Sequence, residues 1–171
     1  MPAKARSPGA LQAITAEPFL HVQMDSFLAM LPDALQDHAD GFAYETIQQD
    51  GKPVVVTRTG SVGEKTLRGM RHAIAAMAGQ GNNLIIDDVL CNGEMSEYIE
   101  LLSGFDLHLV GVVAPLEVLE AREAQRADRL PDLARWQYER VHAGIDYDLE
   151  VDTSVHSPLE CARRIQQQFR L

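Results

Sequence analysis

The sequence predicts an α/β fold, in which helices cover both faces of a doubly wound parallel sheet. Segments with helical spacing of apolar residues alternate with short extended segments along the 171 residues. Two extended segments, residues 83–87 (NLIID) and 109–113 (LVGVV), contain continuous apolar runs. Such runs are typical of parallel strands that are covered on both faces. Because 46% of the residues are hydrophobic, the chain is expected to bury one core of its own.

The order of elements follows from these patterns. Residues 1–9 are rich in proline, glycine and basic side chains and are expected to be irregular, whereas residues 10–171 form one domain. The segments expected to be strands are residues 18–24, 42–48, 54–58, 83–90, 106–114 and 148–154. The segments expected to be helical are residues 10–16, 25–31, 61–78, 94–102, 115–126, 130–143 and 157–169. Residues 42–59 are interpreted as an inserted hairpin, because Asp50-Gly51 is a favoured turn between two strands.

The helix that starts at residue 61 has the clearest signals. Ser61 and Glu64 have the spacing of a capping box. Apolar residues recur at three- and four-residue spacing from Leu67 to Met77, which predicts a helix with one buried face. Gly79 is expected to end the helix.

Charge and cysteine content narrow the class of protein. The formal net charge is −10, from 25 acidic residues against 15 lysines and arginines, so no nucleic-acid partner is expected. Cys91 and Cys161 lack the spacing of a disulfide framework or a zinc site, which indicates a reducing cytoplasm. No apolar run approaches the ~18 residues of a membrane span, and the N-terminus lacks the apolar core of a signal peptide, so no membrane association is expected.

Two adjacent acids, Asp87 and Asp88, stand at the end of an apolar strand. In open α/β sheets, ligands bind beyond the carboxyl ends of the strands. Neighbouring strand residues point to opposite faces, so one acid is expected to face the core side and the other the ligand crevice, where it would hold Mg²⁺ directly or through water. An apolar run that ends in Asp is also the usual second nucleotide-binding motif of phosphate-loop proteins. The alternative is that the pair caps the following turn.

Asp25 closely follows the first predicted strand and precedes apolar helical turns. One interpretation is a plain helix N-cap, since Asp is a favoured cap. The other is a general base that faces a substrate hydroxyl.

Arg126 and Arg129 lie in a polar break between two predicted helices, at residues 123–133, and Arg122 lies one turn earlier. One interpretation is a solvated surface cluster. The other is a mobile lid, whose guanidinium groups close on phosphates, neutralise charge on the transferred group and exclude water. A candidate base, a candidate metal-side acid and candidate lid arginines thus occur in the chain order expected of a small phosphoryl-transfer enzyme.

Four stretches resemble the chloramphenicol phosphotransferase family of small kinases: PFLHVQMDSFLAMLP, LIIDDVL, QRADR and QYERVHAGIDYDLEVDTSVHSPLECA. The resemblance covers nearly the whole chain. It implies that a phosphate passes from ATP, with Mg²⁺, to the hydroxyl of a small acceptor, which is chloramphenicol in the type enzyme. It also implies that Asp25 takes the proton from that hydroxyl and that Arg126 and Arg129 belong to the lid. Asp87 and Asp88 match the family's acid pair, and Asp88 is expected to reach the metal or its water.

The family's opening pattern is a strand, a Gly-x-x-x-x-Gly-Lys-Ser/Thr loop and a helix, and this loop does not occur in the 171 residues. The loop cradles the phosphates and supplies a metal ligand. In phosphate-loop kinases the first strand lies centrally, between the strands that correspond here to residues 83–87 and 107–113. Without it, these two strands are expected either to expose their edges or to pair with each other. Exposed edges invite pairing with another chain, such as a second copy in a homo-oligomer.

Three functions are consistent with these observations. The first is an active small-molecule kinase whose N-terminus is altered here by a misplaced start or a local frameshift. The second is a remnant that is impaired in nucleotide binding and has no kinase activity. The third is a binding or structural module that keeps only the acceptor pocket.

Overall fold

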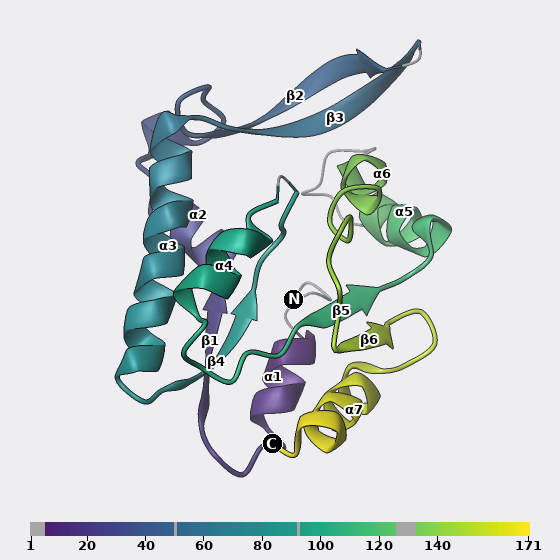
Figure 1. Ribbon diagram of the computed structural model, residues 1–171. Coiled ribbons are helices and arrows are strands. Elements are labelled where there is room, and N and C mark those ends of the chain that lie inside the picture. Colours follow the sequence, from purple (N-terminus) through teal and green to yellow (C-terminus); the bar gives the residue numbers. More distant parts are fainter. Residues whose placement is uncertain (1–5, 50, 92, 126–132) are drawn as a thin grey trace.

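The computed structural model describes residues 6–49, 51–91, 93–125 and 133–171. Its strands form three two-stranded sheets (Figure 1). These are the parallel pair β1 (Phe19–Gln23) and β4 (Asn83–Asp87), the parallel pair β5 (Val110–Val113) and β6 (Leu149–Asp152), and the antiparallel hairpin β2 (Phe42–Gln49) and β3 (Lys52–Thr59). The predicted α/β fold with parallel strands is confirmed. Of the two expected outcomes at the sheet centre, the structure shows separate pairs, because β4 and β5 do not pair with each other in the described residues.

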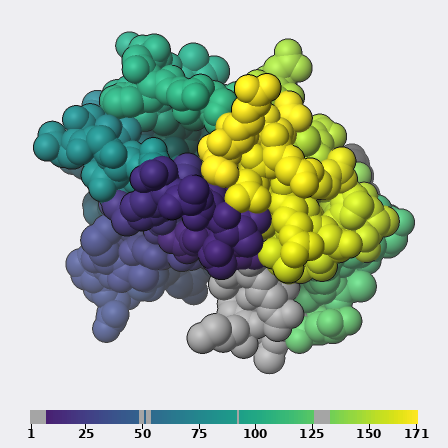
Figure 2. Space-filling model, turned by 90° about the horizontal axis from the view of Figure 1, so that it is seen from below, coloured from purple at the N-terminus to yellow at the C-terminus, as the bar shows by residue number. Residues whose placement is uncertain are grey.

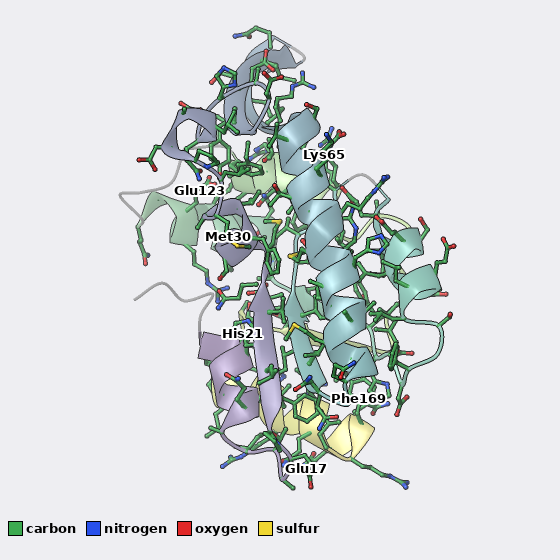
Figure 3. The ribbon with its side chains drawn as sticks, turned by 90° about the vertical axis from the view of Figure 1, so that its left-hand side faces the viewer. Glu17, His21, Met30, Lys65, Glu123 and Phe169 are labelled. Carbon is green, nitrogen blue, oxygen red and sulfur yellow. The ribbon has the colours of Figure 1, made fainter. Side chains whose placement is uncertain are left out.

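Helices flank both parallel pairs. They are α1 (Arg6–Gln12), α2 (Met24–Leu28), α3 (Ser61–Gly79), α4 (Met95–Leu101), α5 (Leu116–Ala124), α6 (Leu133–Tyr138) and α7 (Pro158–Phe169), with a 3₁₀ turn η2 (Asp33–Leu35). Helices α3 and α1 lie on opposite sides of β1 (Figure 3). Among the described residues, no helix combines the length and the hydropathy that crossing a bilayer requires.

The main core lies between the β1–β4 pair and the helices α3 and α4. Val22 of β1 packs there with Met70 and Ile74 of α3, and Tyr98 of α4 completes the buried cluster together with Leu102. Met70 and Ile74 are fully buried, which confirms the predicted apolar face of α3.

The predicted capping box of α3 is wrong. The N-cap is Gly60, and no side chain caps the helix, whose first turn is closed by the Glu64 amide donating to the Gly60 carbonyl. A Cβ at Gly60 would lie 2.0 Å from the Ala39 carbonyl oxygen. The close approach of the preceding chain therefore requires glycine at the N-cap, and the helix starts one residue before a capping box at Ser61 would allow.

Two other helix boundaries also differ from the predictions. Helix α1 begins at Arg6, inside the segment expected to be irregular, and ends at Gln12. Pro8 lies in its first turn, where the missing amide costs no intrahelical hydrogen bond. The helix predicted to run to residue 143 ends at Tyr138 and gives way to turns, with Gly144 at a positive φ of 72°.

The β5–β6 pair has its own cover, made by α7. Val151 of β6 and Cys161 of α7 are almost fully buried. Helix α7 starts with a capping box, in which the Ser157 side chain accepts from the Glu160 amide and the Glu160 carboxylate accepts from the Ser157 amide. Helices α1 and α7 pack side by side (Figure 2), and the Gln166 side chain donates to the Ile14 carbonyl at 2.6 Å.

The β2–β3 hairpin projects from the body of the molecule (Figure 1). Strand β3 contacts α6 and α3. At the base of the hairpin, the Gly41 carbonyl accepts from the Gly60 amide at 2.8 Å, and Gly63 of α3 packs directly against that carbonyl.

We expect the two glycines of α3 to respond in opposite ways to alanine. In Gly63→Ala the new Cβ would lie 2.4 Å from the Gly41 carbonyl oxygen, whereas no atom lies within 4 Å at Gly69. Gly63→Ala should therefore lower the free energy of unfolding by about 1–3 kcal/mol, and Gly69→Ala should raise it by about 0.5–1 kcal/mol through helix propensity. Urea unfolding of both variants tests this. Equal effects of the two substitutions would show that the hairpin base is not seated on α3 in this way.

Candidate active site

The candidate acids lie at one end of the β1–β4 pair. Gln23 and Asp87 are register partners at the carboxyl ends of β1 and β4. Asp25 follows Gln23 by two residues and lies in the first turn of α2. The structure therefore brings Asp25 and Asp87 to the same edge of the same strand pair, where the sequence placed a ligand crevice.

Asp25 is exposed, and its carboxylate makes no hydrogen bond or ion pair within the described part of the chain, whereas its carbonyl accepts from the Ala29 amide. It is not the N-cap of α2: that position is Gln23, and no side chain caps the helix. The capping alternative is therefore wrong. The remaining interpretation, a carboxylate that faces a hydroxyl, agrees with the exposed position, and the N-terminal helix turn favours a negative charge there.

Asp87 and Asp88 face opposite sides of the strand pair, as alternation requires. Leu84 and Ile86 pack against the buried cluster under α3 and α4. Asp88 continues that face: one carboxylate oxygen accepts from the Tyr98 hydroxyl at 2.7 Å, and the other accepts from the Val89 amide at 2.7 Å. Asp88 is thus the acid on the core side.

Asp87 lies on the other face, next to His21 of β1. The His21 Nε2 atom is 3.8 Å from an Asp87 carboxylate oxygen, and the His21 Nδ1 atom is 3.2 Å from the Gln23 side-chain nitrogen. The His21 ring is labelled beside β1 in Figure 3. Since an amide nitrogen can only donate, Nδ1 accepts, so in the neutral ring the hydrogen is on Nε2, which is buried and has no hydrogen-bond partner among the described residues. The sequence favoured Asp88 as the acid that reaches a metal, and this geometry favours Asp87.

A buried polar network holds Asp88 in place. Burial raises the pKa of the Asp88 carboxyl, and hydrogen bonds from Tyr98 and the Val89 amide, together with the charge of Arg71, act in the opposite direction. Burial and the neighbouring Asp88 charge raise the pKa of Tyr98, so its hydroxyl remains a donor. Arg71 is buried and pairs with Glu97 at 2.5 Å. The sequence did not identify Tyr98 as a partner of Asp88, because a tyrosine on an amphipathic helix usually indicates packing in the core.

Arg122 belongs to the other parallel pair. Its guanidinium donates to the Thr153 hydroxyl at 3.0 Å and to the Thr153 carbonyl at 2.6 Å, directly after β6. The Thr153 hydroxyl in turn donates to the Val113 carbonyl at the end of β5. Arg122 therefore fixes α5 to the carboxyl ends of β5 and β6, which is the correct end of the strands for a ligand site.

The predicted lid is described only at its flanks. Arg126 and Arg129 lie outside the described residues, so their roles stay predictions. On the flanks, the Glu123 carboxylate accepts from the Ala134 amide at 2.8 Å, which joins the end of α5 to the start of α6. Arg135 adds an ion pair to Glu120 at 2.6 Å.

Two cavities lie near these elements. One of about 430 Å³ lies between the segment after β4 and the segment after α6, and its lining includes Leu90, Met95, Ile99, Ile145, Arg140 and Cys91. Burial raises the pKa of the Cys91 thiol to about 11, so the thiol is neutral at pH 7. The other, of about 500 Å³, lies at the hairpin base and is lined by residues that include Tyr44 and Arg58. Neither cavity is lined by Asp25, Asp87 or Arg122.

The comparison with known families shows to which family the chain belongs. The family model of chloramphenicol phosphotransferase-like proteins matches residues 4–170. The chain belongs to this family. The resemblance that the sequence motifs indicated is thereby confirmed across nearly the full length.

Individual relatives of the chain are consistent with this family assignment. Two proteins of Mycobacterium tuberculosis (strains CDC 1551 / Oshkosh and ATCC 25618 / H37Rv), each named as a candidate O-phosphotransferase, are 28% identical over 167 residues, which is 94% of this chain and 74% of theirs. Among solved structures, the Deinococcus radiodurans tunicamycin resistance protein matches with a TM-score of 0.61 at 13% identity, covering 96% of this chain and 90% of its own. A sugar kinase from Janibacter sp. HTCC2649 also has a TM-score of 0.61, at 17% identity, with 98% and 89% covered. At these identities the structures support the fold alone.

The family implies that a nucleotide and a divalent metal are used. We compared the described residues with the needs of each in turn. Mg²⁺ is usually held by one or two carboxylates with water and phosphate oxygens, and Asp87 is a carboxylate in the right place. Among the described residues, no group of three or more His, Cys, Asp or Glu side chains forms a metal cage. For the triphosphate, the 171 residues contain no Gly-x-x-x-x-Gly-Lys-Ser/Thr loop, and Gly9 lies inside α1.

We expect Asp88→Asn to change how stability depends on pH. Because the pKa of Asp88 is raised in the folded protein, the folded state binds this proton more tightly than the unfolded state. Its contribution to stability is therefore fully present below the unfolded pKa and is lost as the pH rises through the folded pKa. The free energy of unfolding of the wild type, minus that of Asp88→Asn, should fall as the pH rises from about 3 to about 7, which is the range over which an aspartate of raised pKa loses its proton.

The matched control for this prediction is Asp33→Asn, at an exposed aspartate of the 3₁₀ turn η2. Urea unfolding across the same pH range should give a difference for this control that changes little. A difference for Asp88→Asn that rises with pH would contradict the assignment of Asp88 as the core-side acid.

Proposed function

We propose that the chain is an O-phosphotransferase that acts on the hydroxyl group of a small molecule, with ATP as the phosphoryl donor. The observation that carries this proposal is the exposed Asp25 carboxylate at the carboxyl end of β1, beside Asp87 at the carboxyl end of β4. A base and a metal-side acid just beyond or at the carboxyl ends of adjacent parallel strands are what phosphoryl transfer to a hydroxyl needs from the acceptor side.

In this proposal the role of each residue follows from where it lies. Asp25 accepts the proton of the acceptor hydroxyl. We assign the metal-side role to Asp87, since both carboxylate oxygens of Asp88 already accept hydrogen bonds from Tyr98 and the Val89 amide. Arg126 and Arg129 remain the proposed lid arginines, and their guanidinium groups would neutralise charge on the transferred group.

Arg122 has a supporting part in the same proposal. Its contacts with Thr153 hold the stem of the lid at the ends of β5 and β6. We keep it as a residue that positions the nucleotide side of the site, with the lid as the segment that it anchors.

A second function is favoured by one specific observation. The described residues contain no cradle for a triphosphate, and the two parallel pairs that would flank it are not joined. The alternative is therefore a remnant or binding module that keeps the acceptor side and does not transfer phosphate.

Calorimetry with Mg-ATP separates these two functions. A phosphotransferase should bind Mg-ATP with micromolar affinity as the chain of 171 residues, and such binding would exclude the remnant and the binding module. A remnant should show no micromolar affinity, because the Gly-x-x-x-x-Gly-Lys-Ser/Thr loop does not occur in these residues. A second version, with a strand and a Gly-x-x-x-x-Gly-Lys-Ser/Thr loop grafted ahead of α1, should bind. If the grafted version also fails to bind, the proposed phosphotransferase function loses its support.

We expect Asp25→Asn in a version that transfers phosphate to lower kcat with little change in Mg-ATP affinity. A general base acts in the chemical step and contributes typically 10²–10⁴-fold, and Asp25 is exposed at the strand end. Steady-state kinetics and calorimetry measure the two quantities. Asp33→Asn, in the neighbouring exposed 3₁₀ turn, is the control and should leave both unchanged. Equal losses of turnover and nucleotide affinity in Asp25→Asn would rule out the base role.

A further inference from the structure

A cavity lies beyond the carboxyl end of β4, and the proposed function assigns no role to it. Its volume is about 430 Å³, and it lies between the segment after β4 and the segment after α6, which are close to each other in Figure 1. Small-molecule sites in proteins usually occupy about 300–1,000 Å³. In α/β proteins, ligands bind beyond the carboxyl ends of the strands. The cavity therefore has the size and the position of a small-molecule site.

Much of the cavity wall is apolar. Leu90 and Met95 line it and also pack against the main core, which fixes this side of the wall. Ile145 lines it from the segment after α6. Ile99 lies four residues after Met95 on α4, so the two side chains share a helix face, and Ile99 is 51% exposed. The wall thus presents apolar surface to water, which the apolar body of a ligand would cover.

Among the described residues of the wall, Arg140 alone carries a charge. Its guanidinium lies over the Trp136 ring, with the Cζ atom 4.8 Å from the ring centroid, and its Nη1 atom donates to the Trp136 carbonyl at 2.9 Å. These two contacts hold the guanidinium in place, since an aromatic face attracts a cation. In the described part of the chain, the Nε and Nη2 atoms make no hydrogen bond or ion pair. Arg140 is therefore oriented by Trp136 and keeps donors for a ligand.

The charge of Arg140 is only weakly balanced by its neighbours. Glu139 lies 3.9 Å from Nη1 and its side chain is 68% exposed, and such a surface ion pair contributes little. The Cys91 thiol lines the same wall and is neutral at pH 7, because burial raises its pKa to about 11. Glu94 and Asp88 act on this thiol, but neither lines the cavity among the described residues. An anion at this wall would meet a positive charge with unused donors.

We propose that this cavity binds a small molecule in which an apolar, ring-containing body carries one carboxylate. The body contacts the apolar wall, and the carboxylate accepts hydrogen bonds from the guanidinium of Arg140, whose planar fork matches the two oxygens of a carboxylate. Asp25 does not line the cavity in the described residues. The proposal therefore concerns binding, goes beyond the proposed function, and does not require that this ligand be phosphorylated.

Naphthylacetate and its uncharged amide, naphthylacetamide, are matched probes for this proposal. They have nearly the same shape and the same apolar body, and at pH 7 they differ in the charge of one group. Calorimetry with the chain should show saturable binding of naphthylacetate at one site, with a Kd of about 1 mM or lower, as expected for a ligand of this size. Naphthylacetamide should bind to the same chain about tenfold more weakly, because it lacks the charge that pairs with the guanidinium.

Variants of Arg140 test the role of its charge. Arg140→Gln should bind naphthylacetate about tenfold more weakly than the wild type does, and should change the affinity for naphthylacetamide by less than about threefold. Arg140→Lys keeps the charge without the planar fork and should give an intermediate affinity for naphthylacetate. The matched control is Arg163→Gln, at an exposed arginine of α7 that does not line the cavity, and it should leave the affinity for both probes unchanged.

A second pair of variants tests whether the probes enter the cavity itself. Ala143 lines the cavity and is exposed, so Ala143→Trp should fill the space and weaken the binding of both probes at least tenfold. If Ala143→Trp does not fold, Ile99→Asp serves instead, at a half-exposed position of the wall. Its negative charge should weaken naphthylacetate binding more than naphthylacetamide binding.

Three results would overturn the proposal. The first is that naphthylacetate does not bind to the chain. The second is that the acid and the amide bind equally well, or that Arg140→Gln weakens both to the same extent, since Arg140 would then recognise no carboxylate. The third is that the cavity variants bind both probes as tightly as the wild type does. None of these measurements depends on phosphoryl transfer, so their failure is distinct from a failure of the proposed function.

Discussion

The hydrogen bond from Tyr98 to Asp88 determines how the carboxyl end of β4 is arranged. Tyr98 is buried in the core between the β1–β4 pair and α3, and its hydroxyl is 2.7 Å from the Asp88 carboxylate. A buried hydrogen bond to a charged group contributes about 1.5–3 kcal/mol, and breaking it would leave a buried carboxylate short of a donor. This contact fixes the phase of the alternation along the strand. Asp87 must then face the opposite side, toward His21, and the neighbouring Asp25 completes the polar edge.

Much of this arrangement was predictable from the sequence. The spacing of Met70 and Ile74 predicted the buried face of α3, and the apolar runs predicted the parallel strands, because both patterns report burial directly. Alternation predicted that Asp87 and Asp88 would face opposite sides. It did not predict which acid faces the core, since that depends on Tyr98, which comes from a helix that starts seven residues after Asp88. The cap of α3 was mispredicted for a similar reason, because the approach of the Ala39 carbonyl to Gly60 is a tertiary contact.

The absence of pairing between β4 and β5 in the described residues was also not predictable from local sequence. A continuous apolar strand is compatible with an edge that is paired and with one that is not, because the sequence pattern records the faces of a strand and not its hydrogen-bonding edges. The exposure of Val112 beside the buried Val151 carries information that no window of sequence contains. Here that information is that two register partners on one face of the β5–β6 pair differ in burial.

The two halves of the candidate site lie on different strand pairs. Asp25 and Asp87 belong to the β1–β4 pair, while Arg122 is fixed to the ends of β5 and β6 through Thr153. No strand hydrogen bonds connect these two pairs in the described residues, so packing of helices such as α1 against α7 sets the separation between Asp25 and Arg122. Catalytic groups need to be held within about 0.5 Å of their productive geometry. The precision of the proposed site therefore depends on the packing of helices rather than on strand hydrogen bonds between the two pairs.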